Sequence, residues 1–369
     1  MIQHKETDEA KPVRIGITHG DFNGISYEVI LKALDDSRIT ELFTPVIYCI
    51  PKVLSYHRKN MNLEDFNYKI IQNTRQLDHK KINVVSLSNE EVKVEHGISN
   101  KIAGQFAFQA LEAAVADLKD KLIDVLVTAP VNKANIQSEN FNFPGHTEYL
   151  TERFGSTSSL MLLVHQKLRI GTITGHIPLN QVASSITEDL ILSKITILDS
   201  SLKNDFGIQR PKIAILGLNP HAGDDGVIGD EEKRIIQPAI AAAKKQGFLV
   251  FGPFPADGFF GSDEYTKYDG ILAMYHDQGL IPFKTLSFKS GVNFTAGLPI
   301  VRTSPAHGTA YEIAGKDLAS PESIRQAMFL AIDIFRNRNS MEEMNANPLP
   351  SSSSNERNGR NYSDSDSMH

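Results

Sequence analysis

The sequence predicts an α/β protein of two lobes with mainly parallel sheets. Short runs rich in Val, Ile and Leu alternate along the chain with helical patterns, and strands that alternate with helices form βαβ units. The chain has 369 residues, 41% of them hydrophobic, which is enough to fill two cores. Helices cover both faces of such parallel sheets, so their strands are expected to be apolar throughout.

Seven apolar runs are expected to form strands, in the order "VRIGIT" (13–18), "PVIYCI" (45–50), "IDVLVT" (123–128), "SLMLLV" (159–164), "LRIGTIT" (168–174), "KIAIL" (212–216) and "GILAMY" (270–275). The clearest helical periods lie at 99–119, 187–204, 230–246 and 321–337. After residue 337 the chain is rich in Ser, Asn, Asp and Arg without an apolar period. We expect residues 339–369 to be a disordered tail.

Charge and composition exclude several classes of protein. The net charge is −6 and there is no long basic run, so we expect no nucleic-acid partner. No apolar run approaches the ~18 residues of a membrane span, and the N-terminus lacks the apolar core of a signal peptide. We therefore expect a cytoplasmic protein without membrane contact. The single cysteine, Cys49, lies in an apolar run and is expected to be a buried, inert thiol.

Two glycine-rich loops invite a nucleotide-binding interpretation. In "THGDFNGIS" (18–26) the glycines do not have the G-x-G-x-x-G spacing, and no P-loop lysine follows. Asp21 and Asn23 either line a crevice there or belong to a plain turn. In "SPAHGTAYEIAGKDLASP" (304–321), small residues allow close approach of a ligand and Glu312 can accept hydrogen bonds from ribose hydroxyls. This second loop suits an adenosine pocket, and an ordinary loop is the alternative.

Four histidines, in "FPGHTEYL", "TGHIPLN", "LNPHAGDDG" and "MYHDQG", stand just past apolar runs or beside Gly or Pro. Residues at strand ends project into the crevice of an α/β sheet. Imidazole is a common ligand of transition metals, so three of these side chains from separate loops can form a metal site, although each one alone reads as structural or surface. His146 differs because it begins a helix with Thr147 and Glu148, and such a helix start suits a phosphate or carboxylate.

Cations and amides supply the remaining polar candidates. Lys284 closes the stretch "YDGILAMYHDQGLIPFK" and Arg302 ends "FTAGLPIVR". With Asn293 they form a set of donors for an anionic substrate, because Arg binds carboxylate or phosphate through two parallel hydrogen bonds. Solvated surface charges are the alternative.

Seven motifs together resemble the 4-hydroxythreonine-4-phosphate dehydrogenase family. They are "TAPVNK", "FPGHTEYL", "GHIPL", "LNPHAGDDGVIGDEE", "PADGFF", "YDGILAMYHDQGLIPFK" and "GLPIVRTSPAHGTAYEIAGK", and the resemblance covers residues 13–337. The segment "AHGTAYEIAGK" is also similar to the adenosine-binding loop of isopropylmalate and isocitrate dehydrogenases, with Glu312 at the position of an aspartate that contacts the ribose. The resemblance therefore implies their two-lobed α/β/α fold, with the active-site cleft between the lobes.

This resemblance implies a homodimer that oxidises 4-phosphooxy-L-threonine with NAD and a divalent metal (zinc, magnesium or cobalt), on the route to pyridoxal phosphate. The oxidised product is expected to lose carbon dioxide and give 3-amino-2-oxopropyl phosphate. The active site would lie at the dimer interface, with metal ligands from both subunits. Matching positions are His176, His221 and His276 for the metal; His146, Thr147, Lys284, Asn293 and Arg302 for the substrate; and His307, Gly308, Thr309, Ala310 and Glu312 for the cofactor. Asp257, Asp277 and Lys133 are candidates for proton transfer or for orienting ligands.

The implied division is a nucleotide-binding lobe of residues 1–145 and 295–338, and a metal, substrate and dimerisation lobe of residues 146–294. The first glycine loop departs from the family's G-D-P-A-G-I-G-P-E at Phe22, Asn23, Ser26 and Tyr27, which leaves its substrate contact open. Two rival functions are a sister dehydrogenase acting on a threonate or erythronate 4-phosphate, and a non-catalytic sensor of a phosphorylated metabolite.

Overall fold

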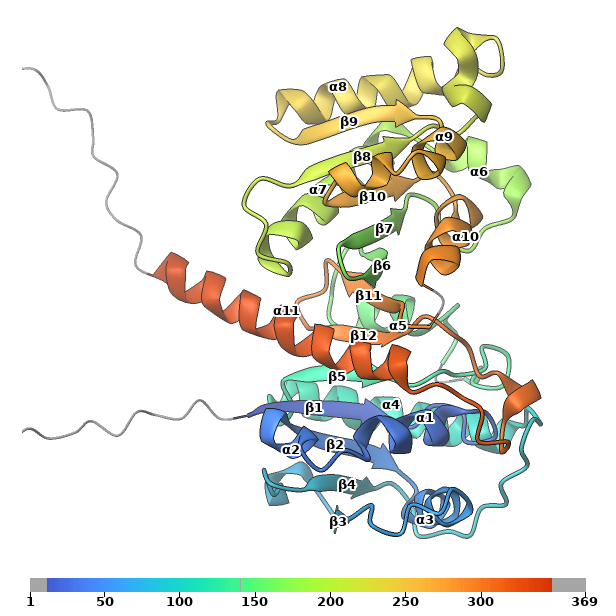
Figure 1. Cartoon of the computed structure of the whole chain (residues 1–369), viewed down its shortest axis with the longest axis vertical. Coiled ribbons are helices and arrows are strands. Elements are labelled where there is room, and N and C mark those ends of the chain that lie inside the picture. Colours follow the sequence, from blue (N-terminus) through green and yellow to red (C-terminus); the bar gives the residue numbers. More distant parts are fainter. Residues whose placement is uncertain (1–11, 140, 288, 347–369) are drawn as a thin grey trace, which may run out of the picture.

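A mixed sheet of twelve strands runs the length of the molecule in the computed structural model, which describes residues 12–139, 141–287 and 289–346. Figure 1 shows it from β3 at one end to β9 at the other. Its strands, in spatial order, are β3 (Tyr68–Ile71), β4 (Ile82–Ser86), β2 (Phe43–Cys49), β1 (Val13–Thr18), β5 (Val125–Thr128), β12 (Arg302–Pro305), β11 (Val292–Ala296), β6 (Leu160–His165), β7 (Leu168–Thr172), β10 (Gly270–Ala273), β8 (Lys212–Leu216) and β9 (Leu249–Phe254).

Within the described residues, eight of the eleven strand pairings are parallel. The three antiparallel pairings, β12 with β11, β11 with β6 and β6 with β7, lie together at the centre of the sheet. They join two parallel halves, one from β3 to β12 and the other from β7 to β9. The predicted α/β class with mainly parallel strands is therefore confirmed.

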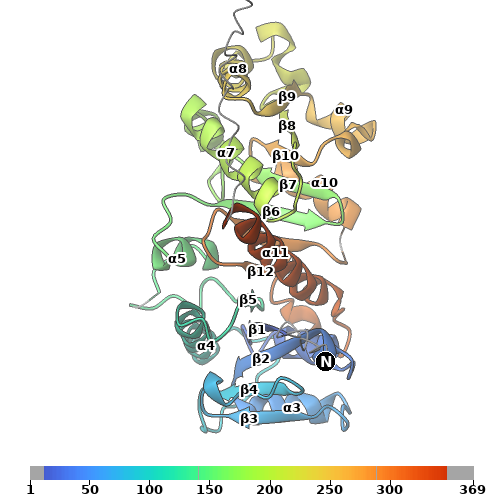
Figure 2. The ribbon, with the colours of Figure 1, turned by 90° about the vertical axis from the view of Figure 1, so that its left-hand side faces the viewer.

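Helices cover both faces of this sheet, as Figures 1 and 2 show. The α-helices are α1 (Ser26–Leu34), α2 (Ile39–Leu42), α3 (Pro51–Asn60), α4 (Lys101–Lys119), α5 (His146–Arg153), α6 (Leu179–Ser185), α7 (Glu188–Asn204), α8 (Gln237–Lys245), α9 (Ala256–Gly261), α10 (His276–Ser287) and α11 (Glu322–Ala346). One apolar core contains residues of α1, α7, α8 and α11, a second lies under α4 and α5, and a third under α9 and α10. Coverage on both sides explains why β1, β2 and β5 are apolar along nearly their whole length.

Five of the strands, β3, β4, β9, β11 and β12, lie outside the seven predicted runs. Two of them, β11 and β12, carry Thr, Arg and Ser at buried positions and Asn293 at a half-buried one, so their sequences do not read as apolar strands. Their polar side chains line the cavity described below or support it. These two strands were not predicted because their polar site residues interrupt the apolar pattern.

The last helix is longer than the sequence predicts. It ends at Ala346, whereas the helical period ends at 337 and the predicted tail begins at 339. Arg338 explains the extension, because its guanidinium pairs with the buried carboxylate of Asp205 at 2.6 Å and donates to the carbonyl of Leu298 at 3.1 Å. The rest of the predicted tail lies outside the described residues.

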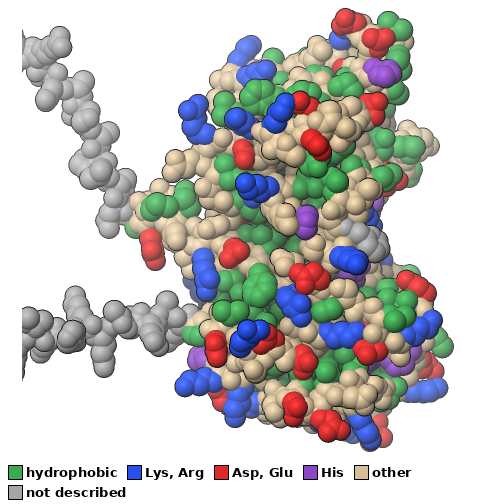
Figure 3. Space-filling model, in the orientation of Figure 1, with side chains coloured by type: hydrophobic (Ala, Val, Ile, Leu, Met, Phe, Trp, Pro, Cys, Tyr) green, Lys and Arg blue, Asp and Glu red, His purple; other side chains and the backbone are tan. Residues whose placement is uncertain are grey.

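The surface carries charges of both signs, and the single cysteine is buried. Figure 3 shows side chains of both charges mixed over one face of the molecule. In the described part of the chain, no helix has the length and apolar character needed to cross a bilayer. Cys49 lies in β2 as a buried free thiol, and burial raises its pKa.

Candidate active site

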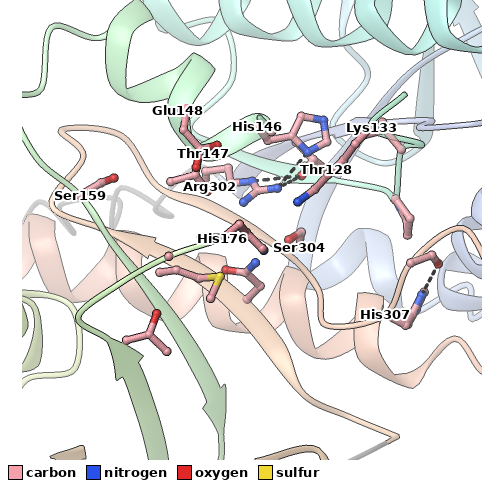
Figure 4. A pocket seen from close by; sticks show the side chains of 18 of the residues that line it. Thr128, Lys133, His146, Thr147, Glu148, Ser159, His176, Arg302, Ser304 and His307 are labelled. Atoms are coloured by element: carbon pink, nitrogen blue, oxygen red, sulfur yellow. Dashed lines mark hydrogen bonds between the residues drawn. The ribbon is translucent and has the colours of Figure 1, made fainter. Parts of the chain in front are cut away.

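A cavity of about 360 Å³ lies at the junction of the two halves of the sheet (Figure 4). The segments that follow β5 and β7 meet there, so the carboxyl ends of strands from both parallel halves open into one space. The hairpin of β11 and β12 forms its floor, and the start of α5 closes one side. Its polar lining residues are Thr128, Lys133, His146, Thr147, Glu148, Ser159, Thr172, His176, Lys194, Asn293, Arg302, Ser304 and His307.

Arg302 is the central cation of this cavity, and only 3% of it is exposed. Its Nη2 and Nε donate to the hydroxyl oxygen of Thr128 at 2.6 and 3.0 Å, and Nη1 donates to that of Thr295 at 3.3 Å. Among the described residues it forms no ion pair, and burial lowers its pKa to about 10. Glu148, which also lines the cavity, attracts this cation without forming an ion pair with it. A buried charge without a directly paired acid is costly, so an anionic ligand would stabilise this arrangement.

His146 begins α5 and lies beside Arg302. Its Nδ1 is 3.2 Å from Nη2 of the guanidinium, which is always a donor, so Nδ1 accepts and the proton is on Nε2. Burial, together with Arg302 and Lys133, holds the pKa of this ring well below its usual range. The ring is therefore neutral, with an N–H available for a ligand.

Three buried polar atoms around the cavity have no hydrogen-bond partner in the described structure: Nε2 of His146, Oδ1 of Asn293 and Nε2 of His307. Buried polar groups in proteins are nearly always paired, and exceptions mark places where a ligand or water belongs. These atoms belong to α5, β11 and the loop after β12, which are three of the elements that line the cavity.

The histidines expected to bind a metal are partly brought together. His176 lines the cavity, and the centre of its ring lies 5.2 Å from that of His276, the first residue of α10. Nδ1 of His276 is 2.7 Å from a carboxylate oxygen of Asp277. His221 lies in a separate loop, and no cluster of three or more His, Cys, Asp or Glu side chains in the described residues could hold a metal ion.

Hydrogen bonds between side chains and backbone groups tie together the loops that carry these histidines. The hydroxyl of Thr174 donates to the carbonyl of Met274 at 2.8 Å. The amide of Gln278 accepts from the N–H of Met274 at 2.7 Å and donates to the carbonyl of Gly217 at 2.6 Å. These hydrogen bonds link the three loops to one another.

The loop with His221 has an unusual backbone, since residues 221–225 all have positive φ. It is fixed by Glu232, a buried carboxylate that accepts from the N–H groups of Leu218 and Asn219 at 2.8 and 2.7 Å. Left-handed conformations cost energy in residues other than Gly and persist only where neighbouring contacts hold them. Glu232 thus positions His221.

Several predicted site residues lie away from the cavity in this chain. Lys284 on α10 and Asp257 on α9 are exposed and do not line it, and Asp277 reaches His276 only from the exposed side. Of the predicted cofactor loop, His307 and Gly308 line the cavity, whereas Thr309, Ala310 and Glu312 lie beyond it.

The first glycine loop is a buried turn rather than a wall of the cavity. Asp21 accepts hydrogen bonds from Asn135 and from the hydroxyl of Tyr311, both at 2.7 Å. Asn23 donates to the carbonyl of Ile98 and accepts from the N–H of Glu95. The residues of this loop that depart from the family pattern are all buried, and none lines the cavity.

Sequence reasoning missed several polar residues of the cavity, among them Thr128 and Lys194. Thr128 is the last residue of β5 and reads as part of an apolar strand. Lys194 is on α7, and its only sequence signal is its place on the apolar side of that helix.

Comparisons with known proteins agree with one another over most of the chain. The family model described as "Pyridoxal phosphate biosynthetic protein PdxA" matches residues 41–331. A 4-hydroxythreonine-4-phosphate dehydrogenase from Bacteroides thetaiotaomicron is 52% identical over 342 residues, which are 92% of this chain and 94% of the relative.

Two further comparisons agree. A relative from Oceanobacillus iheyensis with a provisional name as a D-threonate 4-phosphate dehydrogenase is 36% identical over 328 residues, 88% of this chain and 98% of its own length. The crystal structure of the 4-hydroxythreonine-4-phosphate dehydrogenase from Klebsiella pneumoniae is 36% identical and matches with a TM-score of 0.76, over 89% of this chain and 99% of that one.

Proposed function

Because this chain belongs to the family of the pyridoxal phosphate biosynthetic protein PdxA, we propose that it is a 4-hydroxythreonine-4-phosphate dehydrogenase. It oxidises the secondary alcohol of 4-phosphooxy-L-threonine, and the 3-oxo acid loses carbon dioxide to give 3-amino-2-oxopropyl phosphate. The observation that carries this proposal is the buried guanidinium of Arg302, which has no carboxylate partner in the described residues and lines a cavity of small-molecule size.

Five residues of the cavity have a proposed task in this reaction. Arg302 binds an anionic group of the substrate, and Nδ1 of His146 accepts from its guanidinium and orients it. The hydroxyl of Thr147, in the first turn of α5, and the amide of Asn293 complete the contacts. Of the three candidates for proton transfer only Lys133 lines the cavity, so we assign to its Nζ the proton that leaves the substrate hydroxyl.

NAD is the proposed oxidant. His307 and Gly308 lie at the cavity and continue into the segment with Glu312, which is exposed and able to accept from ribose hydroxyls. We propose that residues 1–145 and 295–338 form the nucleotide-binding lobe, and that residues 146–294 bind the metal and form the dimer contact. When bound, NAD would accept the hydride from the substrate carbon, and His307 and Gly308 would hold it at the cavity.

A divalent metal fits the donor set that the chain provides. Burial lowers the pKa of His176, which keeps its ring neutral, and the carboxylate beside His276 is the group that typically orients a ligating imidazole. Such an ion supplies Lewis acidity that lowers the pKa of the substrate hydroxyl and stabilises the enolate formed on decarboxylation. His176 and His276 of one chain would hold it with His221 of a second copy.

Exposed apolar side chains support this shared site. Leu179, Val227 and Ile281 are 73%, 81% and 64% exposed, and they lie within six residues of His176, His221 and His276 respectively. Exposed large apolar side chains are typical of a surface that another protein covers. A second copy of the chain on this face would bury them and complete the metal site.

The test is a substrate panel with NAD, followed by the absorbance of NADH. The expected order of kcat/KM puts 4-phosphooxy-L-threonine first and the threonate and erythronate 4-phosphates well below it. The reverse order would favour the sister dehydrogenase, a reading that the name of the Oceanobacillus relative supports. No turnover of any of the three, combined with binding of phosphate, would instead indicate the sensor.

A further inference from the structure

We propose that Lys194 is a substrate-binding residue whose ammonium group binds an oxyanion of the substrate. This inference rests on the proposed function for the identity of the substrate. Its physical basis does not depend on that identity. It comes from the position of Lys194 on α7, from its hydrogen bond and from its lack of a carboxylate partner in the described residues.

Lys194 occupies a core position of its helix. The buried residues of α7 include Ile191, Ile195, Leu198 and Leu202, which form an apolar stripe at helical spacing. Lys194 lies three residues after the first of these and four before Leu198, so its side chain leaves the helix on the side that faces the sheet. An apolar residue would be more stable at such a position, and a lysine there needs another reason.

The contacts of Lys194 leave its charge unbalanced. Its Nζ donates to the carbonyl oxygen of Ser159 at 2.5 Å, and within the described residues it has no carboxylate partner. Burial lowers its pKa, which is the direction expected for a cation removed from water without an acid beside it. Lys203 on the same helix differs, because it pairs with Asp199 at 2.6 Å.

Lys194 and Ser159 both line the cavity that contains Arg302. Figure 4 shows Ser159, whose carbonyl accepts from Lys194, to one side of Arg302, so the cavity presents two cations, Lys194 and Arg302, at different places. An ammonium group has three donors and Ser159 uses one, which leaves two for a ligand. The substrate is anionic at both ends, with a phosphate and a carboxylate, and two separated cations match that distribution.

The experiment compares Lys194→Met, which removes the charge and keeps the length, with Lys194→Arg, which keeps the charge. Lys244→Met is the control, because Lys244 is an exposed lysine of α8 that does not line the cavity. For the Met variant at position 194 we expect KM for 4-phosphooxy-L-threonine to rise about tenfold or more, with kcat changed much less. The Arg variant should recover most of this loss, and the control should match the wild type.

Binding of two simple probes, inorganic phosphate and 4-hydroxy-L-threonine, is measured by calorimetry on the same proteins. Weaker binding of phosphate alone assigns Lys194 to the phosphate end of the substrate, and weaker binding of the amino acid alone assigns it to the carboxylate. Either result supports the proposal. Unchanged affinity for both probes and for the substrate overturns it, as does a wild type that binds neither probe.

Thermal unfolding of the ligand-free proteins separates binding from a structural role. Replacing a desolvated lysine by Met on an apolar stripe should leave Tm unchanged or raise it. A fall in Tm together with failure of Lys194→Arg to restore affinity means that the lysine only holds Ser159, and the proposal is wrong. If the wild type does not turn over the substrate with NAD, the proposed function fails while the probe titrations still decide the role of Lys194.

Discussion

The guanidinium of Arg302 rests on the hydroxyl of Thr128, which accepts from Nη2 at 2.6 Å and from Nε at 3.0 Å. The two residues come from adjacent parallel strands, β12 and β5, whose pairing matches Arg302 with Leu126. A neutral oxygen orients the guanidinium without neutralising it. The full positive charge is thereby kept for a ligand.

Replacing Arg302 by Lys should weaken substrate binding, because lysine keeps the charge and loses the planar pair of donors. We expect a loss of roughly 1.5–3 kcal/mol in kcat/KM, the usual contribution of a charge-assisted hydrogen bond. Steady-state kinetics measure it. Thr128→Val is the matched variant that keeps the arginine, and it should cost less. An unchanged KM in Arg302→Lys would show that the substrate anion binds elsewhere.

Removal of divalent metal by a chelator should abolish turnover, and a His176→Ala or His276→Ala variant should lose metal affinity in a calorimetric titration. If two subunits share each metal site, mixing two inactive variants gives a more specific prediction. His221→Ala and His276→Ala should each be inactive, but a mixture of the two should regain activity after subunit exchange, since one site of the hybrid dimer keeps all three ligands. A mixture that stays inactive under exchange places all ligands in one chain.

NAD should be preferred over NADP, because the carboxylate of Glu312 accepts from a 2′-hydroxyl and repels a 2′-phosphate. Glu312→Gln removes the repulsion and should narrow the ratio of the two kcat/KM values. Glu322, the first residue of α11, is a control position on a neighbouring element. Equal specificity for both cofactors in the wild type would mean that Glu312 does not face the ribose.

Arg338→Met should destabilise the fold, because it leaves the carboxylate of Asp205, which is 3% exposed, without its cation. Breaking a buried pair costs about 3–5 kcal/mol, and the hydrogen bond from Ser201 to the same carboxylate should keep the loss near the lower end. A chain that ends at residue 346 retains this pair and should keep the wild-type Tm and turnover. Thermal unfolding of both proteins is the measurement, and a large loss on truncation alone would show that the removed segment docks.

Stability should fall at mildly acidic pH because of buried neutral histidines. In the folded protein, burial lowers the pKa of His19 to about 4 and that of His57 to about 3, from the ordinary value of 6.5. Below pH 6.5 the unfolded chain therefore binds more protons, and the free energy of unfolding drops as the pH falls, by up to roughly 1.4 kcal/mol per pH unit for each ring. Above pH 6.5 the histidines are neutral in both states, so their full contribution to the free energy of unfolding is present.

His57→Phe tests this pH dependence. The ring of His57 stacks on Tyr27 with 6° between the planes, so Phe preserves the contact while removing one titrating group. The free energy of unfolding is measured by urea unfolding at several pH values between 5 and 7.5. It should change less with pH in the variant than in the wild type. The same slope in both proteins would remove His57 from the explanation.

The sequence was informative wherever burial and periodicity coincide. The ranges predicted for β1 and β8 match the structure residue for residue, and α4 and α7 differ by no more than two residues at either end. These elements have apolar patterns because they pack against a core, and an apolar pattern predicts which residues are buried.

The site was less accessible to the same reasoning. Arg302 could be found because an arginine beside small residues stands out, but its strand could not, because β12 consists of Arg, Thr, Ser and Pro. Thr128 was hidden by the opposite effect, as a polar residue that ends an apolar strand. The strands β7 and β10 pair over a long distance in sequence, and this pairing decides which histidines lie together. The spacing of residues along the chain does not predict it.

The order of strands at the centre of the sheet also governs when this protein becomes functional. β5 ends at residue 128 and β6 begins at residue 160, yet β11 and β12, from residues 292–305, lie between them. On the ribosome, the nascent chain therefore exposes two unpaired strand edges through the synthesis of more than a third of its length. Such edges are prone to pair with other chains, and contacts so distant in sequence form slowly. Until the last strands emerge, the two halves remain separate and neither holds a complete binding site, so a ribosome that stalls before residue 305 releases a product that is both inactive and prone to aggregate.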